Sequence, residues 1–400
     1  MTGGELLLWA ATIAVVTPIA VFVVECLAAL LPPREEAPLG ERPPAVVLIP
    51  AHNEAAGIAD TLASVRMQLS PGDEVLVVAD NCTDDTAAIA RREGATVLER
   101  VNPELRGKSY ALDTGVRWLA ERVRPPEIVI ILDADTLPCP GAIEELARTA
   151  HHYHQPVQGA YTLRAAGTQV SSALAAFAFT VRNVVRPQGL RRLGLPCLLH
   201  GSGMAFPWPI LSRAALASGQ LAEDRWLAVD LALAGHCTRF SPASITGAFP
   251  TAAKAVRTQR ERWEHGHLET MLRQTPRLLA GAVRQRRAVL LALALELAVP
   301  PLSLLAIWWF VILLCQGVVL VLGGPWQPML VLAVTGVVWL GTLSMVRRRI
   351  GSPGGKAGNV VHYIGSKLAL YGTYLWKRQK RWIPTERDGA SDERSSGRSG

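Results

Sequence analysis

Two apolar blocks near the ends of the chain constrain its fold more than any other feature, because each is long enough to enter a membrane. The first block, Leu6–Leu31, contains a single charged residue, Glu25. The chain begins MTGGE and has no Lys or Arg before this block, which disfavours a cleaved signal peptide. We therefore expect residues 1–31 to form an uncleaved transmembrane helix. Within it, Glu25 should face another helix, because a carboxylate is costly in lipid.

The second apolar block, residues 288–346, predicts a transmembrane hairpin. Ala288–Leu322 is too long for one straight span and contains Pro300 and Pro301. It is therefore either a kinked span or an interfacial helix that leads into a span. Gln327–Val346 is a further span, and the three arginines that follow it belong in the cytoplasm by the positive-inside rule. Together these features predict a multi-pass protein of the inner, cytoplasmic membrane with three spans and a cytoplasmic central region.

Net charge indicates the kind of partner that the chain binds, and the spacing of its cysteines indicates whether they form disulfides or a zinc site. The chain has a formal net charge of +8, which suits an anionic partner such as membrane lipids or nucleotide phosphates. The basic residues cluster at the membrane boundaries, so we expect no nucleic acid partner. None of the six cysteines belongs to a CxxC pair, which argues against a disulfide framework and a structural zinc site.

Composition alone assigns three further segments. Residues 32–44 are rich in proline and charge and predict a linker. Residues 347–385 mix basic and aromatic side chains with aliphatic ones, which is typical of an amphipathic segment on the membrane surface. Residues 386–400 are small and polar and predict a disordered tail.

The region between the apolar blocks, residues 45–280, alternates strand-like and helix-like segments. Such alternation predicts an α/β fold with a Rossmann-like, mainly parallel sheet that is covered on both faces. The expected strands are Ala45–Ile49, Glu74–Ala79, Thr96–Glu99 and Glu127–Leu132, and the expected helices are Glu54–Leu69, Thr83–Glu93 and Lys108–Arg122. In sheets of this kind ligands bind beyond the carboxyl ends of the strands, so the polar residues just after each strand are the candidates for a site.

Polar residues follow the first two expected strands. Asn53 and Glu54 come after the first, where they either line a ligand pocket or form a turn in which Asn53 caps the next helix. Asp80 follows the second strand, and its carboxylate there can accept hydrogen bonds from a ribose or a base. Asp84 and Asp85 lie at the start of the next helix, where negative charge is favourable, so we interpret them as mainly structural.

Two carboxylates, Asp133 and Asp135, follow the apolar run Ile130–Leu132. A hard divalent cation is the best reason for placing them there. Mg²⁺ or Mn²⁺ takes one or two protein carboxylates and completes its shell with phosphate oxygens of a substrate. The alternative is a pair of capping aspartates in a turn.

Three later segments add candidate groups. Gly201–Phe206, which includes Gly203, begins without bulky side chains and either lets the backbone approach a ligand or forms an ordinary loop. Glu223 and Asp224 precede an apolar helix, where a carboxylate is a cap or, in the case of Asp224, a general base. Gln259–Trp263 offers a guanidinium for a diphosphate and an indole for a sugar, or else forms a basic helix at the membrane.

The order of these segments resembles the family 2 glycosyltransferases with a GT-A fold, and most closely the membrane-embedded branch that includes cellulose synthase and poly-N-acetylglucosamine synthase. The resemblance covers about residues 45–265, and the flanking spans have the expected placement. It rests on the ordered set PAHNE, ADNCTDDT, RGKSYAL, DAD, GSGMAF, ED and QRERW.

The resemblance implies a role for each matching residue. The residues implied in binding the donor nucleotide are Ala51, Asn53, Glu54, Asp80, Lys108 and Asp133. Asp133 and Asp135 are implied in holding Mg²⁺ or Mn²⁺, and Asp224 in acting as the catalytic base. The residues implied at the pyrophosphate and the acceptor are Gly203, Glu223, Gln259, Arg262 and Trp263. The implied reaction is a single displacement with inversion at the anomeric carbon.

The implied function is the transfer of a hexosyl or N-acetylhexosaminyl group from a nucleotide-sugar, with UDP as the preferred nucleotide. The implied acceptor is lipid-linked or a polysaccharide, and the implied process is the synthesis of exopolysaccharide or another cell-surface glycan. Three spans are few for a polymer channel, so a single transfer and a short polymerisation both stay open. The alternatives are a polyprenyl-phosphate monosaccharide transferase and a non-catalytic nucleotide-binding subunit of a synthase. A partner subunit or self-association is a further expectation.

Overall fold

The computed structural model describes residues 2–32, 39–164, 170–217, 219–220, 222–248, 253–351 and five positions between 365 and 372. Most of the expected linker is described, whereas most of the expected surface segment and the whole expected tail lie outside these residues. The chain forms two compact units, each built from separated stretches of sequence. Of the described residues, one unit contains 2–32, 170–195 and 267–351 together with the five positions after 351, and the other contains 39–164 and the described part of 196–266.

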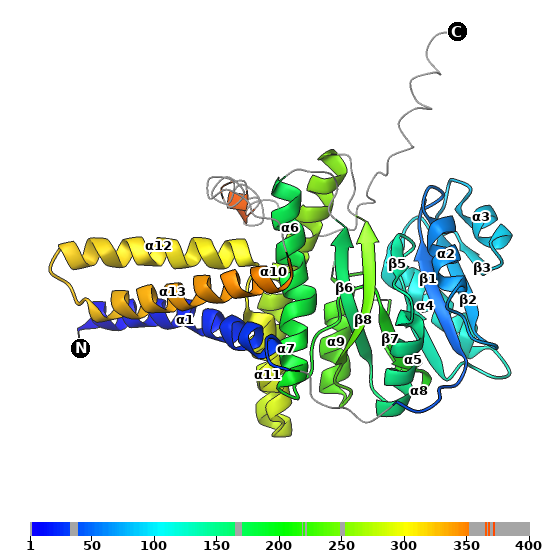
Figure 1. Cartoon of the computed structure of the whole chain (residues 1–400), viewed down its shortest axis with the longest axis horizontal. Helices are drawn as coiled ribbons and strands as arrows, with labels where there is room; N and C mark the ends of the chain where they lie inside the picture. Colours follow the sequence, from blue (N-terminus) through cyan, green and yellow to red (C-terminus); the bar gives the residue numbers. More distant parts are fainter. Residues whose placement is uncertain are drawn as a thin grey trace, which may run out of the picture. The chain divides into compact units, whose positions relative to one another are not determined.

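The second unit is built on an eight-stranded mixed sheet in the order β3-β2-β1-β4-β7-β6-β8-β5 (Figure 1). Its strands are β1 (Ala45–Ala51), β2 (Glu74–Asp80), β3 (Thr96–Arg100), β4 (Ile128–Ile131), β5 (Thr136–Pro138), β6 (Val157–Arg164), β7 (Met204–Pro207) and β8 (Arg239–Ala248). Strands β1 to β4 pair in parallel, β7 runs antiparallel to both β4 and β6, and β5 runs antiparallel to β8. The sheet is therefore parallel where the sequence predicts it to be, and mixed beyond β4.

Helices cover both faces of the sheet, since every residue of β4 and every residue of β1 except Pro50 is buried. The helices of this unit are α2 (Ile58–Arg66), α3 (Thr86–Arg92), α4 (Lys108–Ala120), α5 (Ala142–Tyr153), α8 (Trp208–Leu211) and α9 (Glu223–Leu233). Helix α4 lies directly on β1 and β2, because Gly115 leaves room for the side chains of Leu48 and Val78.

The first unit contains three helices that are long and apolar enough to cross a membrane, as the sequence predicts. They are α1 (Gly3–Ala29), α12 (Leu302–Val321) and α13 (Gln327–Arg349), which lie side by side in Figure 1. The residues before α12 form a separate short helix, α11 (Ala288–Ala298), which ends before Pro300 and Pro301. Helix α10 (Ala253–Gln285) has residues in both units.

A further helical segment of this unit lies between β6 and β7 in the sequence, and no motif marks it. It consists of α6 (Val170–Thr180), a π-helical turn (Val181–Val185) and α7 (Arg186–Arg192). Helix α7 packs against α1 at Gly189, where even a Cβ atom would come within 1.8 Å of the carbonyl oxygen of Glu25.

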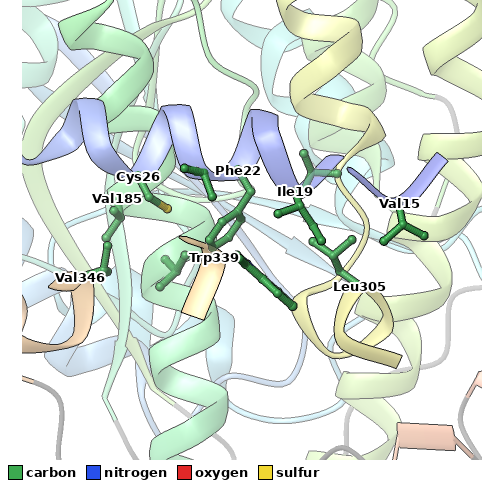
Figure 2. Close-up of a cluster of buried hydrophobic side chains, with 11 residues drawn as sticks. Val15, Ile19, Phe22, Cys26, Val185, Leu305, Trp339 and Val346 are labelled. Carbon is green, nitrogen blue, oxygen red and sulfur yellow. The ribbon is translucent and has the colours of Figure 1, made fainter. Parts of the chain in front are cut away.

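Apolar side chains from α1, the π-helical turn, α12 and α13 form one buried cluster. Figure 2 shows Phe22 and Trp339 at its centre, and their ring centroids lie 6.4 Å apart in an edge-to-face arrangement. At the edge of this cluster Glu25 accepts a hydrogen bond of 2.5 Å from Nε of Arg186, and Arg186 also donates to the carbonyl oxygen of Glu296. The charge expected to face another helix is therefore paired with a side chain of α7.

Candidate active site

Strands β1, β2 and β4 end at one edge of the sheet. Their parallel registers place Ala51 beside Ala79, and Leu48 beside Ile131, so the loops after these strands emerge together. Asp80 is the last residue of β2 and is only 4% exposed. The edge at which sequence reasoning expects a ligand therefore carries polar groups from three neighbouring strands.

Asn53 and Glu54 tie the loop after β1 to the loop after β2. Asn53 has a φ of 53°, and its Oδ1 accepts a 2.8 Å hydrogen bond from the main-chain N–H of Thr83. The main-chain N–H of Glu54 donates to Oγ1 of Thr86 over 2.8 Å. Asp84 accepts from Oγ1 of Thr86 and from a main-chain N–H of the first loop, in keeping with a structural role. These bonds hold the two loops in one conformation.

Asp80 forms an ion pair with Arg100, a residue that is not among the candidates predicted from the sequence. Nη1 of Arg100 donates to Oδ1 of Asp80 over 2.5 Å and to the carbonyl oxygen of Leu105 over 2.8 Å. Asn81 donates to the same carboxylate oxygen over 3.0 Å. The parallel register that pairs Asp80 with Arg100 is the signal that could have predicted this contact, because each is the last residue of its strand.

Lys108 connects two of the expected site segments. Its Nζ donates to Oδ1 of Asp133 and, over 2.5 Å, to the carbonyl oxygen of Gly201. Burial lowers the pKa of Lys108, but the negative charges of Asp133, Glu223 and Asp224 outweigh it, so the net pKa lies above the usual value. The lysine is therefore a fixed positive charge among carboxylates.

The backbone around Asp133 is held from both sides. Its N–H donates to Oγ of Ser202 over 3.0 Å, and its carbonyl oxygen accepts from Oγ1 of Thr136 over 2.9 Å. Ser202 is fully buried, and its carbonyl oxygen accepts from Nε2 of Gln158 over 2.9 Å. Sequence reasoning misses Ser202 and Gln158, because a serine in a glycine-rich loop and a glutamine in a strand carry no distinctive pattern.

Glu223 and Asp224 form the first turn of α9, where the helix N-terminus favours negative charge. A Cβ atom at Gly201 would lie 3.6 Å from Oδ2 of Asp224 and 3.9 Å from Nζ of Lys108, so these two groups flank the same glycine. Burial and the neighbouring charge of Asp224 raise the pKa of Glu223 to about 7, against the opposing effects of Lys108 and Arg262. A carboxyl group with this pKa holds or releases a proton near neutral pH.

Glu223, Asp224 and Lys108 line one hollow of about 450 Å³, a volume that includes its opening to solvent. The other residues around it are mainly apolar and include Leu112, Met204, Leu216, Trp226 and Leu227. Apolar walls around a few polar groups are the pattern that small-molecule sites share.

Asp135 and the three candidates on α10 lie at intermediate exposure, whereas Ala51 and Gly203 are buried. Asp135 is half-buried two residues after Asp133, and α10 carries Gln259, Arg262 and Trp263. Gln259 and Arg262 are three residues apart on that helix and share a face, and the charge of Arg262 acts on Glu223. The structure thus brings five of the predicted residues close enough for their charges to interact: Lys108, Asp133, Glu223, Asp224 and Arg262.

Within the described part of the chain, no three His, Cys, Asp or Glu side chains converge as a complete metal site. Asp133 and Asp135 offer two carboxylates two residues apart, and Mg²⁺ takes one or two carboxylates from a protein when phosphate oxygens complete its shell. The donor set therefore fits a divalent cation that binds together with a phosphate ligand.

Comparison with known proteins finds a matching family model, a partial relative and a similar solved structure. The family model described as "Glycosyltransferase like family 2" matches residues 43–266. The chain is similar to the 4,4'-diaponeurosporenoate glycosyltransferase of Staphylococcus aureus strain MRSA252, with 42% identity over 73 residues. That segment is 18% of this chain and 19% of the relative, so the chain matches only a fifth of the relative's length.

Among solved structures, the chain is similar to the mannosyltransferase PcManGT from Pyrobaculum calidifontis, which was determined in complex with GDP-Man and Mn²⁺. The TM-score is 0.57 at 20% sequence identity, and the match covers 93% of this chain and 100% of that one. At this level of identity the likeness concerns the fold, which is the GT-A fold.

Proposed function

The chain belongs to glycosyltransferase family 2, and on that premise we propose that it transfers a sugar from a nucleoside diphosphate sugar to a lipid-linked or polysaccharide acceptor in cell-surface glycan synthesis. UDP-sugars are the first candidate donors, through the family resemblance. GDP-mannose is the second, because it is bound in the structure of the similar mannosyltransferase PcManGT. A hexosyl or N-acetylhexosaminyl group is the proposed unit of transfer.

The observation that carries this proposal is the arrangement of charges around Gly201. Lys108 contacts Asp133 and the Gly201 carbonyl, and Asp224 lies on the other side of the same glycine. Sugar transfer needs cationic groups near a diphosphate leaving group and a base near the acceptor hydroxyl. This site places both kinds of group around one hollow.

In the proposed mechanism, Asp224 accepts the proton of the acceptor hydroxyl as that oxygen attacks the anomeric carbon. The new bond joins the acceptor oxygen to the anomeric carbon, and the bond from that carbon to the diphosphate oxygen breaks. The nucleoside diphosphate leaves with the electron pair of the broken bond, and the configuration inverts. Lys108 and Arg262 stabilise the negative charge that develops on the leaving group.

Asp133 and Asp135 are the residues that would hold Mg²⁺ or Mn²⁺. A bound divalent cation would stabilise charge on the departing diphosphate as a Lewis acid. Asp80 is proposed to meet the base or ribose of the donor through the part of its carboxylate that Arg100 leaves available. Ala51, Asn53 and Glu54 are proposed to form the wall of the nucleotide pocket. Gly203, Gln259 and Trp263 are proposed to lie at the pyrophosphate and acceptor end.

The three candidate membrane-spanning helices support a membrane location for the enzyme. We place it in the inner membrane with the sheet-containing unit in the cytoplasm, where nucleotide-sugars are available, because the last turn of α13 carries three arginines. Reporter fusions after residue 30 and after residue 351 test this orientation. Periplasmic activity of the reporter after residue 351 would contradict it.

The experiment that tests the function is nucleotide release by the purified full-length chain in detergent. Donors are UDP-, GDP- and dTDP-sugars with Mn²⁺ or Mg²⁺, and acceptors are a native lipid extract and 4,4'-diaponeurosporenoate. We expect release with one donor that depends on an acceptor and is abolished by EDTA. Binding of a nucleotide without release, under every acceptor condition, would instead favour a non-catalytic subunit.

A further inference from the structure

Lys108 occupies a position that is unfavourable for a lysine unless it serves a site. It is the first residue of α4, where the helix dipole disfavours positive charge. Its side chain is only 19% exposed, and burial of an ammonium group is costly. Neither feature strengthens the helix or the core, so the reason for a lysine here must lie in its contacts.

Those contacts are all made with oxygen atoms of the site. Nζ of Lys108 donates to Oδ1 of Asp133 and to the carbonyl oxygen of Gly201, and the negative charges of Glu223 and Asp224 act on it as well. A carboxylate oxygen and a main-chain carbonyl oxygen are also the ligands that a hard divalent cation takes. The ammonium group therefore lies where a cation is favoured, bonded to one of the two carboxylates proposed to hold the metal.

A metal and the ammonium group of Lys108 would meet at the same carboxylate of Asp133. Ser202 and Thr136 fix its main chain from both sides, so only the side chain can rotate. A metal that took Oδ1 would have to displace the ammonium group, and a metal that took Oδ2 of the same carboxylate would still lie close to it, where two positive charges repel.

We propose that Lys108 acts as a substitute cation at Asp133, competing with the divalent metal until a nucleotide diphosphate arrives. This inference rests on the proposed function, because it takes Asp133 as a metal ligand. When the diphosphate binds, its negative charge gives the ammonium group a new partner and so releases Asp133 to the metal. Metal and nucleotide then bind with strong mutual coupling, and the metal alone binds weakly.

The test is a titration of Mn²⁺ into the detergent-solubilised full-length chain, with free Mn²⁺ measured by electron paramagnetic resonance. The titration is repeated at saturating UDP and at saturating GDP. For Lys108→Gln we expect Mn²⁺ alone to bind at least tenfold more tightly than to the wild type. We also expect a smaller enhancement of Mn²⁺ affinity by the nucleotide, since coupling between two ligands is reciprocal.

Three control variants separate the competition from other effects. Lys108→Arg keeps the charge, so Mn²⁺ should bind it as weakly as it binds the wild type. Arg117→Gln removes a positive charge from the exposed side of the same helix, where Arg117 is 75% exposed, and should change nothing. Asp133→Asn added to Lys108→Gln should abolish the gain.

Unchanged or weaker Mn²⁺ binding in Lys108→Gln would overturn the proposal, provided that the variant elutes as a folded protein. If Lys108→Gln does not fold, Lys108→Met is a second neutral variant of similar length. The Asp133→Asn control distinguishes a gain at this carboxylate from Mn²⁺ binding to a misfolded chain. The Mn²⁺ titration does not depend on turnover. Failure of the proposed transferase activity and failure of the proposed cation competition therefore give different results.

Discussion

The ion pair between Glu25 and Arg186 gives the sharpest prediction about the membrane unit. Their side chains are 4% and 6% exposed and lie 2.5 Å apart. Two unit charges at this distance attract by about 7 kcal/mol at an effective dielectric constant of about 20. Desolvation costs several kcal/mol for each ion and cancels most of this attraction. The net contribution of the pair to stability is therefore small, but the cost of removing one partner is large.

Glu25→Leu leaves a buried guanidinium without its carboxylate, and Arg186→Met leaves a buried carboxylate without its guanidinium. We expect each single variant to lose about 3–5 kcal/mol of stability. At roughly 2–4 °C per kcal/mol this corresponds to a fall in Tm of about 6–20 °C. The double variant replaces the pair by apolar side chains, so it should recover most of the loss.

The assay is the fraction of detergent-solubilised protein that remains monodisperse after heating. Arg91→Met is the matched control, because Arg91 and Glu99 are also 2.5 Å apart but are 52% and 55% exposed. Loss of that exposed pair should cost less than about 1 kcal/mol. Single Glu25 and Arg186 variants as stable as the control, or a double variant whose loss equals the sum of the singles, would refute the reasoning.

Three further predictions concern the sheet-containing unit. The pKa of Glu223 rises from 4.5 to about 7 on folding, so between these pH values the folded state binds more protons than the unfolded state, and stability falls as the pH rises. Glu223→Gln should reduce the fall in Tm between pH 4.5 and 7, and the same fall as in the wild type would contradict this prediction. Gly203→Ala should destabilise more than Gly235→Ala in the same heating assay, because both have positive φ but only a Cβ at Gly203 meets a neighbour, the side chain of Ile245 at 2.6 Å. Equal losses of stability would show that the positive φ alone causes the destabilisation. Arg100→Met should cost about 3 kcal/mol and weaken nucleotide binding measured by calorimetry, because it leaves the buried carboxylate of Asp80 without its cationic partner. Unaltered nucleotide affinity would contradict the placement of Asp80 in the nucleotide pocket.

The central sheet could be predicted from the sequence because its strands are short apolar runs followed by polar turns. Strands β1, β2 and β4 begin within one residue of the expected positions, and β1 and β2 extend one or two residues further than expected. The antiparallel part could not be predicted, since β6, β7 and β8 pair across long separations that no local pattern encodes.

The candidate site was predictable to the extent that its residues follow strands or begin helices. Lys108, Asp133 and Asp224 were expected as separate members of a pattern, and the structure brings them to Gly201. The pairing of Arg100 with Asp80 depends on strand register rather than on sequence spacing. The partner of Glu25 could not be named, because Arg186 lies 161 residues further along the chain in a helix with no distinctive pattern.

The measurement that tests the account most directly compares the wild type with Asp224→Asn, using the donor identified by nucleotide release. Donor affinity and acceptor-dependent turnover are measured on the same preparation. The account predicts that Asp224→Asn binds the donor within about threefold of the wild type and loses turnover by at least a hundredfold, which is the lower end of what a positioned general base contributes. Turnover retained within tenfold by a variant that still binds the donor would contradict the assignment of Asp224 as the base and, with it, the proposed geometry of transfer.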